Sequence, residues 1–486
     1  MLSQVDPLAS DVESKQVAWR SCPEVLRIAL SAVYTRGASF RRQLMKKALD
    51  PVAAPPFEIG LDPRPVVYLA AQVEKNETGH RITCGSLLVL PIFGLLFGLP
   101  STFFILVFVV AALLCGIHYS LTQSSLDRFS KAKFSLKTAD ELLNEWHPKA
   151  LDFGIGAVAQ RTLVYKGFDP FRFAGLPIGK WSFTVDVGKA AQTASGKAEL
   201  TTVSALELES TIKRKILQSG FGAIVLREVL AVRGEDALIL PMVSHEPDIK
   251  QPNVLLNDNE VRQLCSKYPN LCRSYLLFHD IRWDGELILT HAVRTSLQGR
   301  IFYIETSKFA LTPPSKDFKI IDRKRFQNKL GTQIALFIGC AIASPLLVVA
   351  ETFNLLAGFA VWGSTSRSKK EYLSSLENDP IYNYGANEST RRQIMDDKFD
   401  HFSQKADLDF AVKAFDQTIV ELIYDYMEEH GVDVSDLRSK VMTIYNSGIL
   451  VQGGDVTAQA MAVGQGSTAQ ANTVPKNPLS TKAHAS

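Results

Sequence analysis

The stretch ITCGSLLVLPIFGLLFGLPSTFFILVFVVAALLCGIHY, residues 82–119, decides how this chain is organised. It is strongly apolar, and no Asp, Glu, Lys or Arg occurs from Ile82 to Leu126. A single membrane span needs about 20 residues, so this stretch is nearly long enough for two. The Gly-Leu-Pro-Ser step at residues 98–101 interrupts it, because proline disfavours a continuous helix. The sequence therefore predicts a transmembrane helical hairpin, transmembrane hairpin 1, within residues 82–126, with the arms Gly85–Leu99 and Ser101–Tyr119.

Basic residues flank the predicted hairpin on both sides. They are Lys75 and Arg81 before it, and Arg128, Lys131, Lys133 and Lys137 after it. Cytoplasmic flanks of membrane segments carry an excess of Lys and Arg, and a hairpin places both of these flanks on that side. We therefore expect a multi-pass protein of a bacterial inner membrane, with both termini in the cytoplasm and the lipid bilayer as a partner.

A second apolar block lies at residues 329–363, again between basic flanks. Residues 331–350 are numerous enough to span, whereas the run 355–362 is too short to cross as a helix, so the return arm is expected to be short or re-entrant. Glu351 separates the two runs, and a carboxylate at depth costs at least about 2.5–3.5 kcal/mol unless it is paired or hydrated. Glu351 is therefore the membrane functional candidate, as an ion-pathway or oligomer-contact residue. The alternative places it among lipid headgroups at the apex of this block.

Residues 1–81 are predicted to hold a basic amphipathic helix, Glu24–Leu49, and a proline-rich linker at residues 53–56. Six Lys and Arg side chains of this helix accompany one acid, Glu24. Two interpretations stay open. The helix lies on the anionic cytoplasmic lipid surface, or it docks on the soluble domain with its charges solvated.

Residues 127–328 predict a cytoplasmic α+β domain with a mixed, mostly antiparallel sheet and helices on one face. Helical patterns occupy Thr138–Trp146, Ala205–Gly220 and Asn257–Lys267; strands are expected at Ile224–Val232 and Ala237–Val243, and a strand hairpin at Leu287–Ser296 and Ile301–Leu311. No Walker A loop, dinucleotide fingerprint, zinc-protease motif or nucleophile elbow occurs in this domain. We therefore expect no cofactor.

Two polar clusters remain as weak catalytic candidates, His245 with Glu246 and His279 with Asp280. A histidine beside a carboxylate can perform acid–base chemistry, although ordinary polar turns have the same composition. Asp397 and His401, four residues apart, are weak metal-ligand candidates on one helix face, and a solvated polar face is the alternative. Among the six cysteines, Cys265 and Cys272 lie seven apart, which matches no zinc-binding spacing.

Residues 364–447 form an acidic helical region, in contrast to the basic flanks of the two apolar blocks. Residues 371–436 hold 16 acidic and five basic side chains, so this region should avoid anionic lipid. An apolar stripe over residues 408–426, followed by a shorter one at 437–445, predicts a C-terminal helical hairpin. Its apolar face should pack on the α+β domain or on a second copy, which makes a homo-oligomer an expected partner.

Residues 448–486 form a low-complexity tail of small and polar residues. Such a tail cannot bury enough apolar surface to form a core, so it is expected to be disordered, unless short strands in it pair between chains as an assembly ribbon. Residues 449–471 resemble the small-residue tails of some bacterial conflict proteins. The resemblance implies a role in bacterial conflict or stress response.

Three functions fit these patterns. The first is a membrane-localised interaction or sensing module that recognises a cytoplasmic protein partner. The second is an oligomerising membrane effector that permeabilises the bilayer, and the third is a membrane-bound enzyme. We favour the first, since catalytic motifs are absent from the sequence, and the small net charge of +3 does not favour nucleic acid as a partner.

Overall fold

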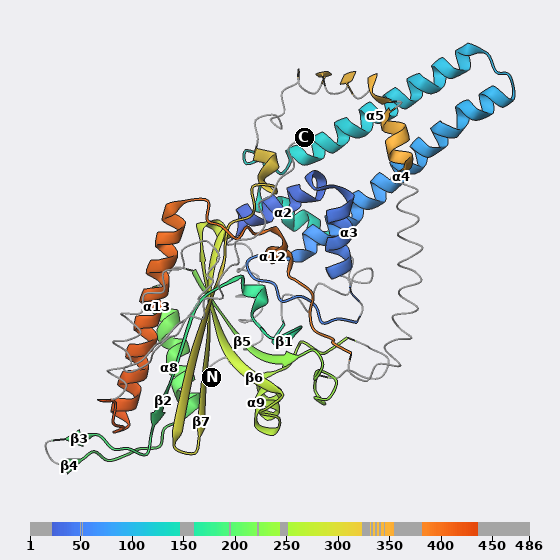
Figure 1. Cartoon of the computed structure of the whole chain (residues 1–486). Helices are drawn as coiled ribbons and strands as arrows, with labels where there is room; N and C mark the ends of the chain where they lie inside the picture. Colours follow the sequence, from blue (N-terminus) through green and yellow to red (C-terminus); the bar gives the residue numbers. More distant parts are fainter. Residues whose placement is uncertain are drawn as a thin grey trace, which may run out of the picture.

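The computed structural model describes residues 22–48, 50, 52–145, 160–193, 196–220, 223–243, 251–322, 331, 334–335, 338–339, 342–344, 346–353 and 382–435. Within these ranges the chain forms an α+β domain around a mixed sheet, and two long apolar helices project from it (Figure 1). The expected second helix of the C-terminal hairpin, residues 437–445, and the tail, residues 448–486, lie outside the described residues.

The large sheet has six strands in the order β1-β5-β6-β7-β8-β2. Their bounds are β1 Thr162–Tyr165, β2 Leu176–Asp186, β5 Ala223–Arg233, β6 Cys272–Arg282, β7 Leu287–Gln298 and β8 Ile301–Leu311. Strands β5 to β8 form an antiparallel meander, β2 adds to β8 antiparallel, and β1 pairs with β5 in parallel. The prediction of a mixed, mostly antiparallel sheet is confirmed, and so is the hairpin of β7 and β8. A small second sheet pairs β3 (Gln192–Thr193) with β4 (Gly196–Lys197).

Helices cover both faces of the large sheet, so the expectation of one covered face was wrong. Successive strand residues point to opposite faces. In β6, Leu276 and Phe278 pack in one hydrophobic cluster with α8 (Ala205–Gln218) and α13 (Phe402–Glu429). Leu277 and Ile281 pack in another cluster with the N-terminal helices. The continuous run of buried residues along β6 is typical of a strand that is covered on both sides.

The N-terminal segment forms two helices where the sequence suggested one, α2 (Pro23–Thr35) and α3 (Gly37–Ala48). Gly37 has a φ of +73°, a conformation that glycine adopts at little cost and that ends helices. Nine consecutive residues of α2 are buried, from Val25 to Val33. The docked arrangement therefore describes α2, and its cation, Arg27, is buried and paired with Glu24 and Asp322 instead of being solvated.

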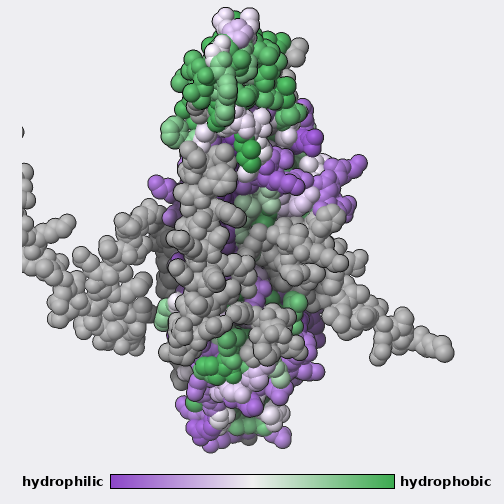
Figure 2. Space-filling view, turned by 90° about the vertical axis from the view of Figure 1, so that its right-hand side faces the viewer, coloured by the Kyte–Doolittle hydropathy of each residue, from purple (hydrophilic) through white to green (hydrophobic). Residues whose placement is uncertain are grey.

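The two long apolar helices are α4 (Pro63–Leu96) and α5 (Ser101–Asp127), joined by a turn at residues 97–100. By length and composition, both are long and apolar enough to cross a membrane. The expected break at the Gly-Leu-Pro-Ser step is confirmed, although α4 begins at Pro63, well before the predicted arm. Figure 2 shows a largely hydrophobic surface over the outer part of this hairpin, with pale, weakly polar residues at its very tip. Leu95, Leu96 and Phe97 are strongly exposed in this part of the chain.

Four further predictions, three helices and one strand, can be compared with the described residues. Helices α6 (Leu136–Asn144), α8 and α9 (Asp258–Lys267) lie where helical patterns occur, and Asn257 caps α9 as part of a capping box. The strand expected at Ala237–Val243 was wrong, because this segment forms consecutive turns. Its Ala237, Leu240 and Val243 are nevertheless buried, in a cluster with β5 and α9, so its apolar pattern reflects burial without strand pairing.

Candidate functional site at the base of the apolar hairpin

Helix α4 belongs to two environments. Its first half is part of the core of the α+β domain, where Val66, Val67 and Ala70 are fully buried. Its last turn is three-quarters exposed at Leu95 and Leu96. One uninterrupted helix therefore connects the folded domain to the apolar hairpin, and the residues at the junction couple the two.

A network of ionised side chains lies at this junction. Arg41 of α3 is fully buried; its Nε donates to Glu74 Oε2 at 3.0 Å, and its guanidinium also pairs with Glu77. Arg81, one residue before the uncharged stretch, donates through Nη2 to Glu77 Oε2 at 2.7 Å. Buried charges are tolerated when each has a partner, and removing one partner leaves the other uncompensated. The buried members of the network therefore depend on one another.

Glu351 joins this network from the second apolar block. Arg81 Nε donates to Glu351 Oε2 at 3.0 Å, and the two side chains are 7% and 32% exposed. The sequence singled out Glu351 but did not identify Arg81 as its partner. The sequence offered one indication of this pairing, since Arg81 and Glu351 each border a long uncharged stretch. The rest of the return arm, residues 354–381, lies outside the described residues.

The described part of the second block packs on the first hairpin. Val348 lies in one hydrophobic cluster with Cys84, Leu87, Ala111 and Cys115, and Leu347 packs against that cluster. Glu351 therefore lies one turn beyond the contact between the blocks, on the same side as Arg81.

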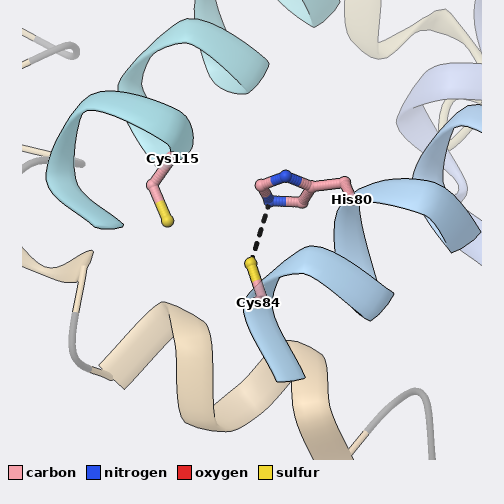
Figure 3. Close-up of side chains that lie close together, drawn as sticks. All are labelled: His80, Cys84 and Cys115. Atoms are coloured by element: carbon pink, nitrogen blue, oxygen red, sulfur yellow. Dashed lines mark hydrogen bonds between the residues drawn. The ribbon is translucent and has the colours of Figure 1, made fainter. Parts of the chain in front are cut away.

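A cluster of imidazoles and thiols lies next to the charge network. His80 and Cys84 come from α4, and Cys115 comes from α5 (Figure 3). One ligand atom from each of these three residues lies within 4.8 Å of the other two. The ring of His118, one turn beyond Cys115, stacks on His80 with 3.8 Å between centroids and an interplanar angle of 2°. Among the described residues, His80, Cys84 and Cys115 are the group of side chains whose spacing could hold a metal ion.

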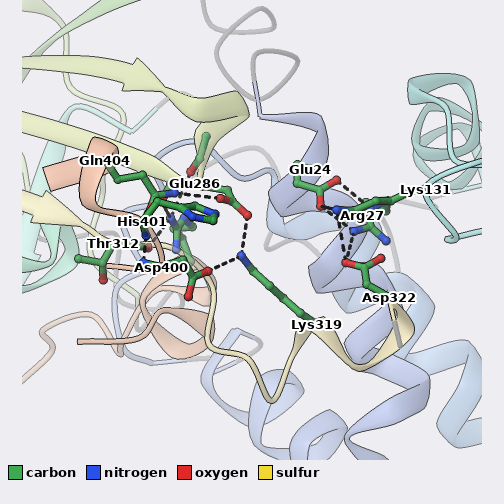
Figure 4. Close-up of polar contacts among 12 residues, drawn as sticks. Glu24, Arg27, Lys131, Glu286, Thr312, Lys319, Asp322, Asp400, His401 and Gln404 are labelled. Carbon is green, nitrogen blue, oxygen red and sulfur yellow. Dashed lines mark hydrogen bonds and ion pairs between the residues drawn. The ribbon is translucent and has the colours of Figure 1, made fainter. Parts of the chain in front are cut away.

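A second set of ion pairs fixes the chain just before the second block (Figure 4). Asp322 of η4 (Lys319–Asp322) accepts from Arg27 Nη2 at 2.9 Å, and Arg27 also pairs with Glu24. Lys319 Nζ binds Glu286 at 2.7 Å and Asp400 at 2.8 Å. Opposing carboxylates raise the pKa of Lys319 despite its partial burial, which by itself lowers it. The segment leading to the second block is thus held by α2 and by the approach to α13.

The sheet separates the side chains of His279 and Asp280. They are neighbours on β6, so their side chains point to opposite faces of the sheet. His279 is fully buried with its Nδ1 at 3.0 Å from Thr290 Oγ1, and burial holds its pKa well below the usual range. Burial raises the pKa of Asp280, which accepts from Arg282 Nε at 2.8 Å. His245 and Glu246 lie outside the described residues.

Asp397 and His401 are both exposed at the approach to α13. The His401 ring stacks on Trp283 with 6.1 Å between centroids, and its backbone N–H donates to Gln404 Oε1 at 3.2 Å. Among the described residues, the two candidates are not joined by a third ligand.

The domain also contains a cavity of about 230 Å³ between β1 and the segment that precedes α12 (Thr390–Ile394). Lys166, Arg172, Arg392, Asp169 and Glu388 are among its lining residues, so its charges are mixed. Ligand sites in proteins usually measure about 300–1,000 Å³. The cavity is small by that standard.

Together, these observations define the class of protein: an α+β domain whose helix α4 continues into an apolar hairpin, with a buried charge network at the junction. The chain belongs to the AbeC-like domain family, whose model matches residues 180–458. The match runs from within β2 past α13 and leaves out the hairpin of α4 and α5. No curated protein and no solved structure matches the chain.

Proposed function

We propose that this chain is a membrane-localised interaction or sensing module. In this proposal the apolar hairpin and the second block lie in a bilayer, while the α+β domain and α13 face the cytoplasm and recognise a protein partner. The observation that carries the proposal is the continuity of α4, because a helix shared by a domain core and an apolar hairpin transmits position between them.

The surface of the hairpin supports insertion in lipid. Leu95, Leu96 and Phe97 are 74–75% exposed, and Ile105 and Leu106 on α5 are more than 60% exposed. Soluble proteins rarely expose a contiguous apolar surface of this kind, whereas hydrocarbon accommodates it without penalty. The charged side chains of α4 are confined to the part that precedes Ile82.

The geometry gives less support to the two alternatives. A pore-forming effector would use Glu351 in an ion pathway, but its carboxylate is paired with Arg81. An enzyme that used His279 and Asp280 would need both on one accessible surface, but they are buried and point to opposite faces of the sheet. The proposal includes a role in bacterial conflict or stress response, which the resemblance of the tail implies.

Labelling of introduced cysteines tests the proposed topology. In a Cys265→Ser background, Leu99→Cys reports the hairpin tip and Ser210→Cys reports the exposed surface of α8. We expect a membrane-impermeant maleimide to label Leu99→Cys in intact cells, and Ser210→Cys only after permeabilisation. Labelling of Ser210→Cys from outside, or a full chain that stays monodisperse in buffer without detergent, would overturn the proposal.

Ion flux separates this proposal from the effector alternative. The full chain is reconstituted into liposomes loaded with a self-quenching dye, at increasing protein-to-lipid ratios. We expect no leakage above that of protein-free liposomes. Leakage that rises with protein density and disappears in Glu351→Ala would favour the permeabilising effector instead.

A further inference from the structure

Helices α4 and α5 present four metal-binding side chains to each other, outside the residues matched by the family model. His80 and Cys84 are four residues apart on α4, and Cys115 and His118 are three apart on α5. Residues at these spacings lie on one face of a helix. Each helix therefore contributes one thiol and one imidazole to the contact between them.

The distances suit a tetrahedral ion. His80 Nε2 lies 3.5 Å from Cys84 Sγ, and the ligand atoms of His80, Cys84 and Cys115 are all within 4.8 Å of one another. An ion with bonds of about 2.0–2.3 Å to nitrogen and sulfur separates its tetrahedral ligands by about 3.3–3.8 Å. The His80–Cys84 pair already has this separation, and no pair has to close by more than about 1 Å.

The surroundings of the cluster resemble those of a metal site more than those of an ordinary core. Cys84 and Cys115 are 1% and 5% exposed, and thiols alone could pack there as small hydrophobic groups. The two imidazoles are half-buried at the base of the hairpin and lose part of their hydration there. Metal ligation would satisfy a nitrogen of the His80 ring, on which His118 stacks.

A carboxylate stands behind the cluster. Glu351 interacts electrostatically with both imidazoles, and it is held in place by Arg81. Metal-bound histidines usually donate their second N–H to a carboxylate, a carbonyl or water, which orients the ring. The second apolar block thereby places a carboxylate near ligands that belong to the first hairpin.

We propose that His80, Cys84 and Cys115 bind one transition-metal ion of the Zn²⁺ class, with a water as the fourth donor, or His118 once its ring turns out of the stack on His80. Two thiolates and an imidazole are ligands that Zn²⁺ takes in tetrahedral sites. The ion links α4 to α5 next to the charge network and fixes the angle at which the hairpin leaves the domain. This site does not depend on the function proposed above, since a metal link between two helices is independent of what the domain recognises.

Cobalt substitution tests the site on the full chain in detergent, with thiols kept reduced. We expect one Co²⁺ per chain, the intense visible bands of tetrahedral Co²⁺, and a near-ultraviolet thiolate-to-cobalt charge-transfer band. One equivalent of Zn²⁺ should displace the Co²⁺ and remove all of these signals. Wild-type protein that shows no such bands, although both thiols react with a thiol reagent after denaturation, would overturn the proposal.

Variants assign the ligands. Cys84→Ser with Cys115→Ser should abolish the charge-transfer band. The matched control, Cys265→Ser with Cys272→Ser, also removes two thiols that hydrogen-bond each other, and it should keep the band. The reverse result, a band lost only in the control, would place the metal at Cys265 and Cys272 and contradict the proposal.

Two single substitutions keep the test decisive if the double serine variant fails to fold. His80→Gln should weaken Zn²⁺ binding at least about tenfold, and Glu351→Gln about 10–100-fold, as for other outer-shell carboxylates. A chromophoric chelator that competes for Zn²⁺ measures both, with circular dichroism and gel filtration in detergent as checks on folding. Unchanged Zn²⁺ affinity in a folded His80→Gln variant would contradict the site.

Discussion

Arg81 supplies the positive charge that pairs with two carboxylates at the junction between the domain and the hairpin. It pairs with Glu77 on its own helix and with Glu351 from the second block. Arg81→Leu leaves both carboxylates without this cation in a mostly buried position, so we expect the free energy of unfolding to fall by about 3–5 kcal/mol. Thermal unfolding of the full chain in detergent, followed by tryptophan fluorescence, measures the loss.

Arg42→Leu is the matched control for that prediction. Arg42 pairs with Glu74 in the same network, but its side chain is 37% exposed. Exposed ion pairs contribute about 0–1 kcal/mol, so this variant should unfold almost as wild type does. Equal losses for the two variants would mean that the buried network does not stabilise the junction.

Two buried histidines make stability depend on pH. His279 and His291 are fully buried, and burial holds the pKa of each well below its ordinary value. The folded chain therefore keeps both neutral, while the unfolded chain binds two protons as the pH falls below about 6.5. We expect the free energy of unfolding to be constant above that pH and to fall by up to about 2.7 kcal/mol per pH unit below it.

Denaturant unfolding between about pH 5 and pH 7 checks this dependence. His291→Phe keeps an aromatic ring against Phe415, on which His291 stacks at 3.7 Å, and it should halve the slope. His401→Gln, at an exposed position, should leave the slope as it is in wild type. If His291→Phe kept the full wild-type slope, His291 would not be a source of the pH dependence.

At the scale of elements, the continuity of α4 is the property that matters most. Gly79 lies on its exposed side just before Ile82, and an added Cβ would meet no atom within 4 Å. Gly79→Ala should stabilise the chain by about 0.5–1 kcal/mol, because alanine loses less backbone entropy in a helix. Gly79→Pro should cost about 3 kcal/mol and break the helix at the junction.

Limited trypsin digestion of chain in liposomes separates these two variants. Lys75 is exposed on α4, where helical structure protects the wild-type chain. Gly79→Pro should be cut at Lys75 at least about tenfold faster, since a break of this cost raises the population of locally open chain. Equal cleavage of both variants would contradict the prediction that proline at this position breaks the helix at the junction.

At the scale of the whole molecule, Arg391 anchors the segment that follows the second block to the α+β domain. It is fully buried, and its Nη2 donates to the carbonyl oxygens of Gly285, Glu286 and Thr312 at 2.8–3.1 Å. Arg391→Met would orphan three buried carbonyls, at about 1–3 kcal/mol each, so we expect a loss of at least about 3 kcal/mol. Arg392→Met, a half-buried neighbour, is the control, and denaturant unfolding followed by circular dichroism compares the two.

Features that depend on residues close together in the sequence could be predicted, whereas contacts between distant residues could not. The apolar hairpin, the β7–β8 hairpin and the capped helix α9 were predictable, because each depends on neighbours within a few tens of residues. The placement of Glu351 beside Arg81 was not, since the two are 270 residues apart and many cations could have been its partner. The same holds for the His80, Cys84 and Cys115 cluster, whose ligands come from two helices with no motif spacing between them.

The sequence by itself determined that two apolar stretches interrupt an α+β chain and that the first of them folds back on itself. Hydrophobicity and a helix-breaking proline are local properties, so no knowledge of packing was needed. Only the tertiary structure decided that helices cover both faces of the sheet, that α4 continues from the core into the hairpin, and that Arg81 meets Glu351. Each of these depends on which distant side chains become neighbours, and that is settled by packing and by the need of buried charges for partners.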